Sequence, residues 1–580
     1  MPLLTSLKPL ALPAIICQVA LLSLLIVGCD PNNSSQAAVP HPPGANQVLY
    51  YPVLQSTTFT LDPALANDAD SIRVVDTLFT GLVALDDKLH VHPQLADYWE
   101  QSDDGLTWTF HLKPSLLFSD GTPLTSYDVA YSIDRALQPA TKSPTALIFL
   151  SMIKDADKLL GGQITTLIND SIQTPDDNTI MISTNKPAAY FLEALTYPCS
   201  YVVEKKSIDK YGNDKFTNHL GAGGGAGPFV MKGYVPQQSI NLVPNPDYYD
   251  PQPRLQKLIF SFYKDTYATY QAYQNNQLDF TEVNGALFPT SKLRTDFSRQ
   301  PVLETVNFAL NYATKPFDNI HLRQAFALAI DKDSIVHTVT KGKMIATNHI
   351  IPQGMPGYNP NLTGPDGVRE THGDLTKARE LFWIGLQEEG WSGISQMPLI
   401  KISYPADSKD VENAVISIID MWHSAFGITA IKNPLSDQDL ANGITQSYRN
   451  REGLQMWHTV WRADYPDPQD ILESQFGLNE PANAFNYGYN QAANVSIQQK
   501  VQQLIAQTSA DQNAQVRMVN YQMLEQQLVD DVAWVPLWQR TGNYLLKSCV
   551  QGLSFNALEI IPPDDWANIY LSAQQPCAHS

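Results

Sequence analysis

The sequence predicts a mixed α/β fold, because segments with strand periodicity are interleaved with segments of helical periodicity. In residues 107–112 every second side chain is apolar, so Trp108, Phe110 and Leu112 share one face of a strand. In residues 322–330 apolar side chains recur at i, i+3, i+4, i+7 and i+8, as on the buried face of a helix. With 580 residues, 43% of them apolar, the chain is long enough for two or more lobes.

The predicted elements follow one another along the whole body of the chain. A strand is expected at residues 47–54 and an amphipathic helix near 70–79. Thr125 and Asp128 have capping-box spacing, which predicts a helix from Thr125 through Ala136. Further helices are expected at 334–339, capped by Asp331, and around 518–528.

Residues 1–28 have the pattern of a secretory signal peptide. Lys8 is the only charged residue, an apolar run follows, and the small residue Gly28 precedes Cys29. The ending Ile-Val-Gly-Cys resembles the lipobox of bacterial lipoproteins, which implies that Cys29 is lipidated and becomes the first mature residue. The pattern therefore predicts a lipid anchor.

A transmembrane anchor is the alternative for this segment, since the run from Leu10 to Gly28 is about 19 residues long. The run stops at the cysteine, and a tether rich in Pro, Ser, Asn and Ala follows in residues 29–46, which favours the lipoprotein. Asp30 resembles the signal that retains lipoproteins at the inner membrane. We therefore expect the protein on the periplasmic side of the cell envelope, anchored to the inner membrane.

The composition and motifs exclude several classes of function. A formal net charge of −20 argues against binding nucleic acid or an anionic membrane through a basic patch. There is no HExxH, GxSxG or Walker loop, so we expect no enzyme and no cofactor, although a glycosidase pair of distant carboxylates leaves no sequence pattern. The acidic pairs at 86–87 and 530–531 are expected to be solvated.

Two short patterns have an ordinary structural explanation beside a functional one. Residues 221–227 match GxGxxA, but they lead into a predicted strand rather than a helix, so a flexible loop is favoured over a phosphate site. His90 and His92 would share one side of a strand, but no acidic ligand set accompanies them, and a solvated turn is favoured over a metal site. We therefore expect no metal.

Three cysteines remain after the signal peptide and Cys29, namely Cys199, Cys549 and Cys577. An odd number permits at most one disulfide. An exported protein reaches an oxidising compartment, which permits a Cys549–Cys577 bond. Free buried thiols are the alternative.

The most informative stretch is residues 461–468, which follow a strand-like run at 454–460. Two prolines close the stretch, so the strand runs out into a fixed turn. Asp464 lies at this transition between the aromatic residues Trp461 and Tyr465. It is placed either to cap its own backbone, as aspartates in turns do, or to pair with a ligand's amino group.

An ordered set of short motifs runs through residues 47–570. The motifs are Leu61-Asp-Pro63, Leu78-Phe-Thr-Gly-Leu82, Gln94-Leu-Ala-Asp-Tyr-Trp99, Trp108-Thr-Phe-His-Leu-Lys113, Phe118-Ser-Asp-Gly-Thr-Pro123, Gly227-Pro-Phe229, Asn245-Pro-Asp-Tyr-Tyr249, Arg323-Gln-Ala-Phe-Ala-Leu-Ala-Ile-Asp-Lys332, Ile351-Pro352, Ala463-Asp-Tyr-Pro-Asp-Pro468 and Phe485-Asn-Tyr487. In order, spacing and identity the set resembles the family 5 extracellular solute-binding proteins, the oligopeptide, dipeptide and nickel group of ABC importers.

The resemblance implies a two-lobed type II periplasmic-binding-protein fold with three domains, a hinge and an interlobe cleft. It implies a discontinuous domain I at 47–79, 204–307 and 543–580, an inserted domain II at 80–203, and a domain III at 308–542. It also implies a monomer that closes around its ligand and delivers it to an ABC permease and ATPase complex.

In peptide-binding members of this family, the aspartate of a Trp-x-Ala/Gly-Asp motif pairs with the ligand's α-amino group. The resemblance gives that role to Asp464 and places Trp461, Arg462, Ala463 and Tyr465 beside the peptide. A gapless carry-over of the segment 60–79 places three further residues at the cleft edge, namely Asn67, Asp68 and Ala69. Arg462 stands where oligopeptide binders commonly have a cysteine, so the side-chain specificity remains open.

The predicted function is therefore an extracytoplasmic peptide-binding lipoprotein of an ABC importer. A nickel chelate, a sugar or a murein peptide is the alternative ligand, and a sensory lipoprotein without transport is the alternative role. Arg449, Arg451 and His458 are the candidates near the motif for pairing the ligand's C-terminal carboxylate.

Overall fold

The structure is a computed structural model that describes residues 46–574 and residue 577. The predicted signal peptide, the lipid site Cys29 and nearly all of the tether lie outside the described residues, so these three remain predictions. Among the described residues, none of the helices combines the length and the apolar character that crossing a membrane requires.

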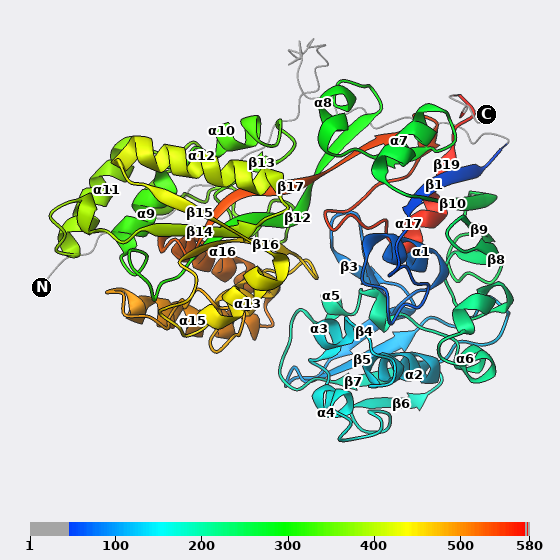
Figure 1. Cartoon of the computed structure of the whole chain (residues 1–580). Coiled ribbons are helices and arrows are strands. Elements are labelled where there is room, and N and C mark those ends of the chain that lie inside the picture. The colour runs from blue at the N-terminus through cyan, green and yellow to red at the C-terminus, as the bar shows by residue number, and fades with distance from the viewer. Residues whose placement is uncertain (1–45, 575–576, 578–580) are drawn as a thin grey trace, which may run out of the picture. The chain divides into compact units, whose positions relative to one another are not determined.

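Two four-stranded sheets come from the first half of the described chain (Figure 1). One has the order β1-β10-β9-β8, in which β1 is parallel to β10 and the other pairs are antiparallel. The other has the order β4-β5-β7-β6 and is antiparallel throughout. The strands are β1 (Val48–Leu54), β4 (Ala96–Gln101), β5 (Thr107–Leu112), β6 (Ile172–Asp176), β7 (Thr179–Ser183), β8 (Phe229–Val235), β9 (Ser239–Pro244) and β10 (Lys257–Tyr263).

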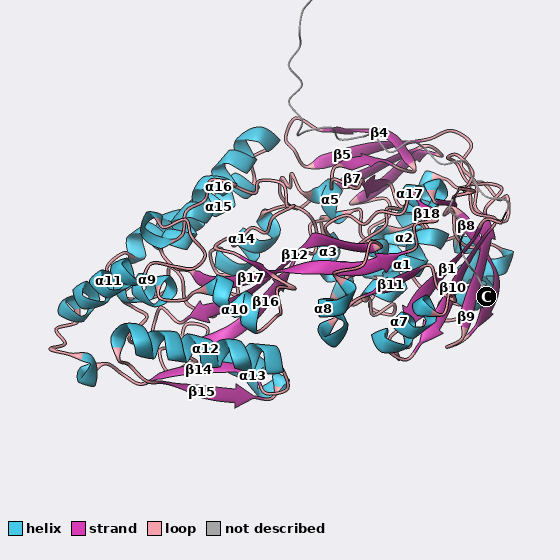
Figure 2. Ribbon diagram, turned by 90° about the horizontal axis from the view of Figure 1, so that it is seen from above, coloured by secondary structure: helices cyan, strands magenta, loops and turns pink. Residues whose placement is uncertain are grey.

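A third, mixed sheet comes from the second half of the chain and has the order β11-β17-β12-β16-β14-β15, with β13 paired to β17. Its two longest strands, β12 and β17, are antiparallel neighbours, and α12 packs on β14 and β15 (Figure 2). The strands are β11 (Phe280–Glu282), β12 (Phe297–Leu310), β13 (Ile345–Ala346), β14 (Ile400–Pro405), β15 (Ala430–Leu435), β16 (Met456–Arg462) and β17 (Trp534–Leu546).

Helices cover these sheets, and two short strand pairs, β2–β3 and β18–β19, complete the described elements. The short strands are β2 (Val83–Leu85), β3 (Val91–Pro93), β18 (Val550–Gln551) and β19 (Tyr570–Leu571). The α-helices are α1 (Ala69–Leu78), α2 (Ser126–Leu137), α3 (Ala146–Leu150), α4 (Ala156–Leu160), α5 (Phe191–Ala194), α6 (Lys205–Tyr211), α7 (Thr266–Gln274), α8 (Phe288–Ser291), α9 (Ile320–Leu328), α10 (Lys332–Thr338), α11 (Leu375–Glu388), α12 (Lys409–Phe426), α13 (Asp437–Ser447), α14 (Gln469–Phe476), α15 (Val495–Ser509), α16 (Ala514–Asp530) and α17 (Pro563–Asn568).

The elements expected from periodicity and capping are present. Strand β5 buries Trp108, Phe110 and Leu112 on one face, as the alternation predicted. Helix α2 begins with the predicted capping box, in which the Thr125 backbone N–H donates to the Asp128 carboxylate at 2.9 Å. Helices α1, α9 and α10 lie within one or two residues of their predicted positions, and α16 begins four residues before the predicted start and ends two residues after the predicted end.

The glycine-rich segment 221–227 differs from the flexible loop that was expected. It leads into strand β8, as predicted, but residues 223–227 are buried against the end of α1. A Cβ atom on Gly225 or Gly227 would overlap the carbonyl group of Leu78. Gly225 and Gly227 are therefore explained by a close approach of two backbones, whereas Gly223 and Gly224 have positive φ angles of 134° and 113°.

The acidic pair 530–531 was expected to be solvated, and this is wrong for Asp531. Its carboxylate is buried and accepts hydrogen bonds from the Tyr487 hydroxyl at 2.7 Å and from the Asn494 amide at 3.0 Å. Periodicity placed the residue correctly at the end of a helix. Sequence alone did not show that two distant polar side chains meet there and compensate its burial.

Cysteine and histidine positions resolve two of the open alternatives. Cys549 and Cys577 form a disulfide, with Cα atoms 5.3 Å apart, and Cys199 is a free buried thiol. His90 contacts the Asp86 carboxylate at 3.2 Å and the His92 ring contacts the Pro93 carbonyl at 3.1 Å. His90 thus has a local partner at the exposed end of a turn, whereas His92 lies in strand β3 and not in the solvated turn that was expected.

The predicted limits of domains I and III fall inside continuous strands. The limit at 307/308 lies in β12, and the limit at 542/543 lies in β17, next to it in the sheet. The residue ranges given for domains I to III remain predictions.

We predict that Gly225→Ala destabilises the protein by about 1 to 3 kcal/mol, because the added methyl group must displace a packed backbone. Urea unfolding measures the change. Gly233→Ala is the matched control, since its new Cβ would lie 3.7 Å from the nearest atom, the Asn241 amide nitrogen. Equal stability of the two variants would contradict the close-packing explanation.

Candidate ligand-binding site

Strand β16 contains the first two residues of the motif at 461–468, and the rest of the motif forms the turn that follows the strand. The strand pairs with β12 through Arg462, its last residue. The Ala463 N–H then donates to the Leu303 carbonyl at 2.8 Å, which holds the chain beside β12 for one more residue. Asp464 therefore starts the turn from a backbone position set by the sheet.

Two other aspartates fix this turn, so Asp464 is not needed for capping. The buried Asp470 carboxylate accepts the backbone N–H of Asp464 at 2.9 Å. The buried Asp467 carboxylate accepts the Gln469 N–H at 2.9 Å and forms an ion pair with the buried Arg517. The capping role that competed with ligand binding in the sequence thus belongs to Asp467 and Asp470.

The Asp464 side chain is accessible on a cavity wall. Within the part of the chain that the structure describes, its carboxylate makes no hydrogen bond and no ion pair. The surrounding protein desolvates it and raises its pKa, and the Arg462 guanidinium partly opposes that shift. An accessible, unpaired carboxylate in a partly desolvated site is suited to a cationic ligand group.

The cavity beside Asp464 has a volume of about 190 Å³. Its walls come from the segment that enters α1, from α1 itself, from the end of β16 and from the loop before α17. Five of the eight predicted ligand-binding residues line it: Asn67, Ala69, Arg462, Ala463 and Asp464. The remaining wall residues are Ile72, Arg73, Asp76, Tyr197, Leu558, Glu559, Ile560 and Ile561.

The other three predicted residues do not line this cavity. Asp68 is the N-cap of α1 and accepts the Ser71 N–H at 2.9 Å. Trp461 is buried in the hydrophobic cluster that also contains Ala463 and Leu558. The Tyr465 ring stacks on Tyr190 with ring centroids 5.6 Å apart. These side chains shape the site from behind rather than face its contents.

Sequence reasoning missed Arg73 and Asp76, which are one helical turn apart on α1, and Tyr197. Charged positions on an amphipathic helix normally face solvent, so the pattern gave no signal that both charges are buried. The loop residues 558–561 were also missed, because they approach the cavity from the far end of the chain.

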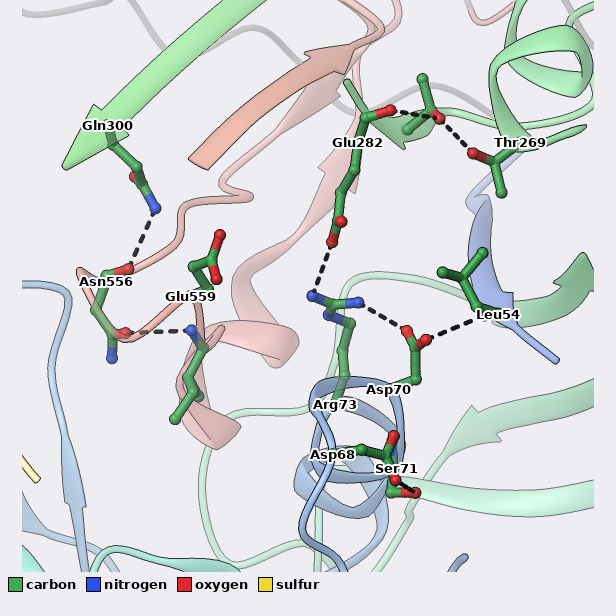
Figure 3. A network of polar contacts seen from close by, with 12 residues as sticks. Leu54, Asp68, Asp70, Ser71, Arg73, Thr269, Glu282, Gln300, Asn556 and Glu559 are labelled. Carbon is green, nitrogen blue, oxygen red and sulfur yellow. Dashed lines mark hydrogen bonds and ion pairs between the residues drawn. The ribbon is translucent and has the colours of Figure 1, made fainter. Parts of the chain in front are cut away.

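A second cavity of about 120 Å³ shares Arg73 and Glu559 with the first and is rich in charged residues. Arg73 lies between Asp70 and Glu282, at 3.1 Å and 3.4 Å (Figure 3). Glu559 pairs with Arg540 and, at 3.4 Å, with Arg462. Lys343, Gln300, Asn284 and Asn543 also line this cavity.

Comparison with known families accounts for this architecture. The family model described as bacterial extracellular solute-binding proteins, family 5 Middle, matches residues 90–483, more than half of the chain. The chain belongs to family 5 of the solute-binding proteins. The family is one of binding proteins, which agrees with the lack of any enzyme motif in the sequence.

Relatives within family 5 include proteins named for oligopeptides. The oligopeptide-binding protein OppA of Bacillus subtilis is 27% identical over 430 residues, 72% of this chain and 76% of that protein. The periplasmic oligopeptide-binding protein OppA of Escherichia coli is 27% identical over 509 residues, 85% of this chain and 87% of that protein.

A solved structure shows the same fold. The periplasmic murein tripeptide binding protein MppA, in its unliganded open form, superposes with a TM-score of 0.77 at 22% identity, covering 91% of this chain and 98% of that one. The fold is therefore that of the two-lobed solute-binding proteins, as the resemblance implied.

The three predicted partners for a ligand carboxylate do not line either cavity. His458 is buried, and burial lowers its pKa to about 4, so the ring is neutral at pH 7. The Arg449 side chain donates to the Asn479 amide oxygen at 2.8 Å, and Arg451 is exposed. The cations that line the two cavities are instead Arg73, Lys343, Arg462 and Arg540.

Possible metal ligands cluster once among the described residues, at Asp279, Cys549 and Cys577. The two cysteines are joined in the disulfide, so their sulfur atoms are not thiolate ligands. This cluster gives no support to a metal site.

We predict that Arg517→Met destabilises the protein by about 3 to 5 kcal/mol, because it leaves the Asp467 carboxylate buried without its cation. The double variant Arg517→Met/Asp467→Asn should recover part of that loss. Lys186→Met is the control, since the Lys186–Glu473 pair is partly exposed and should contribute about 0 to 1 kcal/mol. Urea unfolding of the three variants tests the assignment, which requires Arg517→Met to cost more than Lys186→Met.

Proposed function

We propose that this chain is the substrate-binding lipoprotein of an ABC importer and that it binds short peptides by their free amino terminus. The observation that carries the proposal is the Asp464 carboxylate, which is held at a strand end, faces a cavity and has no partner among the described residues. The α-ammonium group of a peptide would supply the missing cation and up to three N–H donors.

The strand that precedes Asp464 offers the peptide a backbone partner. Strand β12 occupies one edge of β16, and on the other edge β14 pairs only with Met456 and Trp457. Within the described chain, residues 458–462 therefore have no strand on that second edge. A peptide whose amine lies at Asp464 can extend along this edge and form main-chain hydrogen bonds, which bind peptides without regard to side-chain type.

Apolar and charged residues would share the selection of side chains. Ile72, Leu558, Ile560 and Ile561 give the first cavity an apolar wall, while Arg462 places a cation beside Asp464. The 27% identity to two oligopeptide-binding proteins supports peptides as the ligand class.

The importer role and the location follow from the family and from the N-terminal pattern. The family is described as extracellular, and the Ile-Val-Gly-Cys ending resembles a lipobox. We infer a monomer that is anchored through Cys29 on the periplasmic side of the inner membrane and delivers peptide to a permease and ATPase complex. A protein that retains peptide but does not support its uptake in cells would be a sensor instead.

A murein peptide, a nickel chelate and a sugar remain the alternative ligands. A murein peptide with a free amine would use the same carboxylate, whereas a sugar or a chelate has no ammonium group for Asp464. The proposed function is therefore tested by identifying the ligand that is purified with the protein and by measuring whether Asp464 is needed to bind it.

We predict that protein purified from a peptide-rich medium carries masses of short peptides in native mass spectrometry, and that Asp464→Asn loses them. Removing one partner of a desolvated charge pair should weaken binding by about 2 to 5 kcal/mol. Asp97→Asn is the matched control, because Asp97 is exposed on β4 and lines neither cavity.

Peptides retained equally by Asp464→Asn and Asp97→Asn would sink the assignment of Asp464. A purified protein that carries a sugar or a metal chelate would leave the family intact and overturn the peptide proposal.

A further inference from the structure

Two carboxylates, not one, lack a cation partner in the first cavity. The acidic residues on its wall are Asp76, Asp464 and Glu559. Glu559 is paired with two arginines. Asp76 and Asp464 form no ion pair within the described part of the chain, and both also line a small adjoining cavity together with Tyr197. The two unpaired carboxylates thus belong to residues that line the same two cavities.

The Asp76 carboxylate is held in one orientation. Only 1% of the residue is exposed. The Tyr201 hydroxyl donates to its Oδ1 at 3.1 Å, whereas its Oδ2 is buried and finds no hydrogen-bond partner among the described residues. Arg73, one turn earlier on α1, forms its ion pairs with Asp70 and Glu282 instead.

Leaving a buried carboxylate oxygen unsatisfied costs more than a hydrogen bond returns. Four such oxygens occur among the described residues, on Asp76, Glu193, Asp318 and Glu525, and of these residues only Asp76 lines the cavity beside Asp464. Such an atom calls for an explanation, and on a ligand-cavity wall the direct one is that the ligand supplies the donor. Burial raises the pKa of Asp76 to about 8, against the opposing effects of Tyr201 and Arg73. The carboxyl group is therefore mostly protonated at pH 6 to 7.

We propose that Asp76 is the second carboxylate of the ammonium subsite and that it releases its proton when the ligand's amine binds. This inference rests on the proposed function, since it takes the amine at Asp464 as given. The ammonium group would donate to Asp464 and to the free Oδ2 of Asp76. The neutral carboxylic acid becomes a carboxylate, its proton passes to solvent, and the ligand keeps its own three protons.

The charged and titratable groups around Asp76 come from each element that surrounds it. A ligand cation that contacts both carboxylates would favour the ionised form of Asp76, which would couple the ionisation of Asp76 to binding. Arg73 is the cation on α1, and Tyr197 and Tyr201 flank the short segment 198–200. Arg462 and Asp464 come from the end of β16, and Glu559 comes from the loop before α17. Burial raises the pKa of Tyr201, the hydrogen-bond donor to Asp76, and Asp76 itself and Asp564 on α17 raise it further.

The test is isothermal titration calorimetry of the purified protein with oligoalanines of two to five residues, each as the free amine and as the N-acetyl form. Titrations at pH 6.5 in two buffers of different ionisation enthalpy count the protons released. We expect about one proton released per free-amine peptide bound by the native protein. We expect none with Asp76→Asn, an isosteric variant that keeps the acceptor oxygen for Tyr201.

The pH dependence gives a second readout that needs no variant. Because binding releases a proton, affinity should rise about tenfold per pH unit between pH 6 and 7 and level off near pH 8. It should fall above pH 8, where the peptide's own amine, with a pKa of about 8, loses its charge. Burial raises the pKa of Glu193 to about 7, so this residue titrates in the same range. Glu193 is present in both the native protein and Asp76→Asn, so it cannot account for a difference in pH dependence between them.

Each outcome decides between the proposals. Proton release and a pH slope that both vanish in Asp76→Asn would support the inference. Binding of free-amine peptides without proton release, or with equal release by Asp76→Asn, would overturn the inference and leave the proposed function standing. Binding of no free-amine peptide, or equal binding of the N-acetyl forms, would overturn the proposed function and the inference together.

Discussion

The buried ion pair between Asp467 and Arg517 is the interaction on which the site depends. It joins the turn after β16 to helix α16, far away in the sequence, and it lies beneath the cavity wall. With Asp467 held, Asp470 can accept the backbone N–H of Asp464, and the turn has one geometry. Three aspartates at a spacing of three residues thus differ in their roles, because Asp467 and Asp470 fix the turn, whereas the Asp464 carboxylate has no partner among the described residues.

Aromatic packing ties the same turn to a distant segment. The Tyr465 ring stacks on Tyr190 and lies edge-on to Phe149, in the cluster that contains the β4–β7 sheet. Tyr465 follows Asp464, and Trp461 lies three residues before Asp464. These two aromatic residues belong to different hydrophobic cores. Asp464 therefore lies between neighbours in the chain that belong to two different hydrophobic cores.

Many charged residues line the two cavities, but few of their carboxylates lack an ion-pair partner among the described residues. Glu282 and Glu559 are each matched to an arginine, which offsets the desolvation of both partners. The exceptions are Asp464, which is accessible, and Asp76, which is buried and whose pKa is raised until it is mostly neutral at pH 7. In such surroundings a carboxyl group without a cation partner is stable either when it is accessible to solvent, as Asp464 is, or when it is protonated, as Asp76 is.

The sequence by itself determined most of the elements and the family, and it predicted a lipid anchor. Periodicity and capping residues act over a few positions, so they predicted β5, α2 and α9, and the ordered motifs indicated family 5 and Asp464. Only the tertiary structure decided that Asp467 and Asp470 do the capping and that Asp531 and the glycines of 223–227 are buried. Only it brought Asp76 and residues 558–561 to the same cavity. Most of these facts depend on contacts between segments that are distant in the sequence, from 37 residues between Asn494 and Asp531 to several hundred between Asp76 and residues 558–561. Local patterns carry no record of which distant side chain will compensate a buried charge.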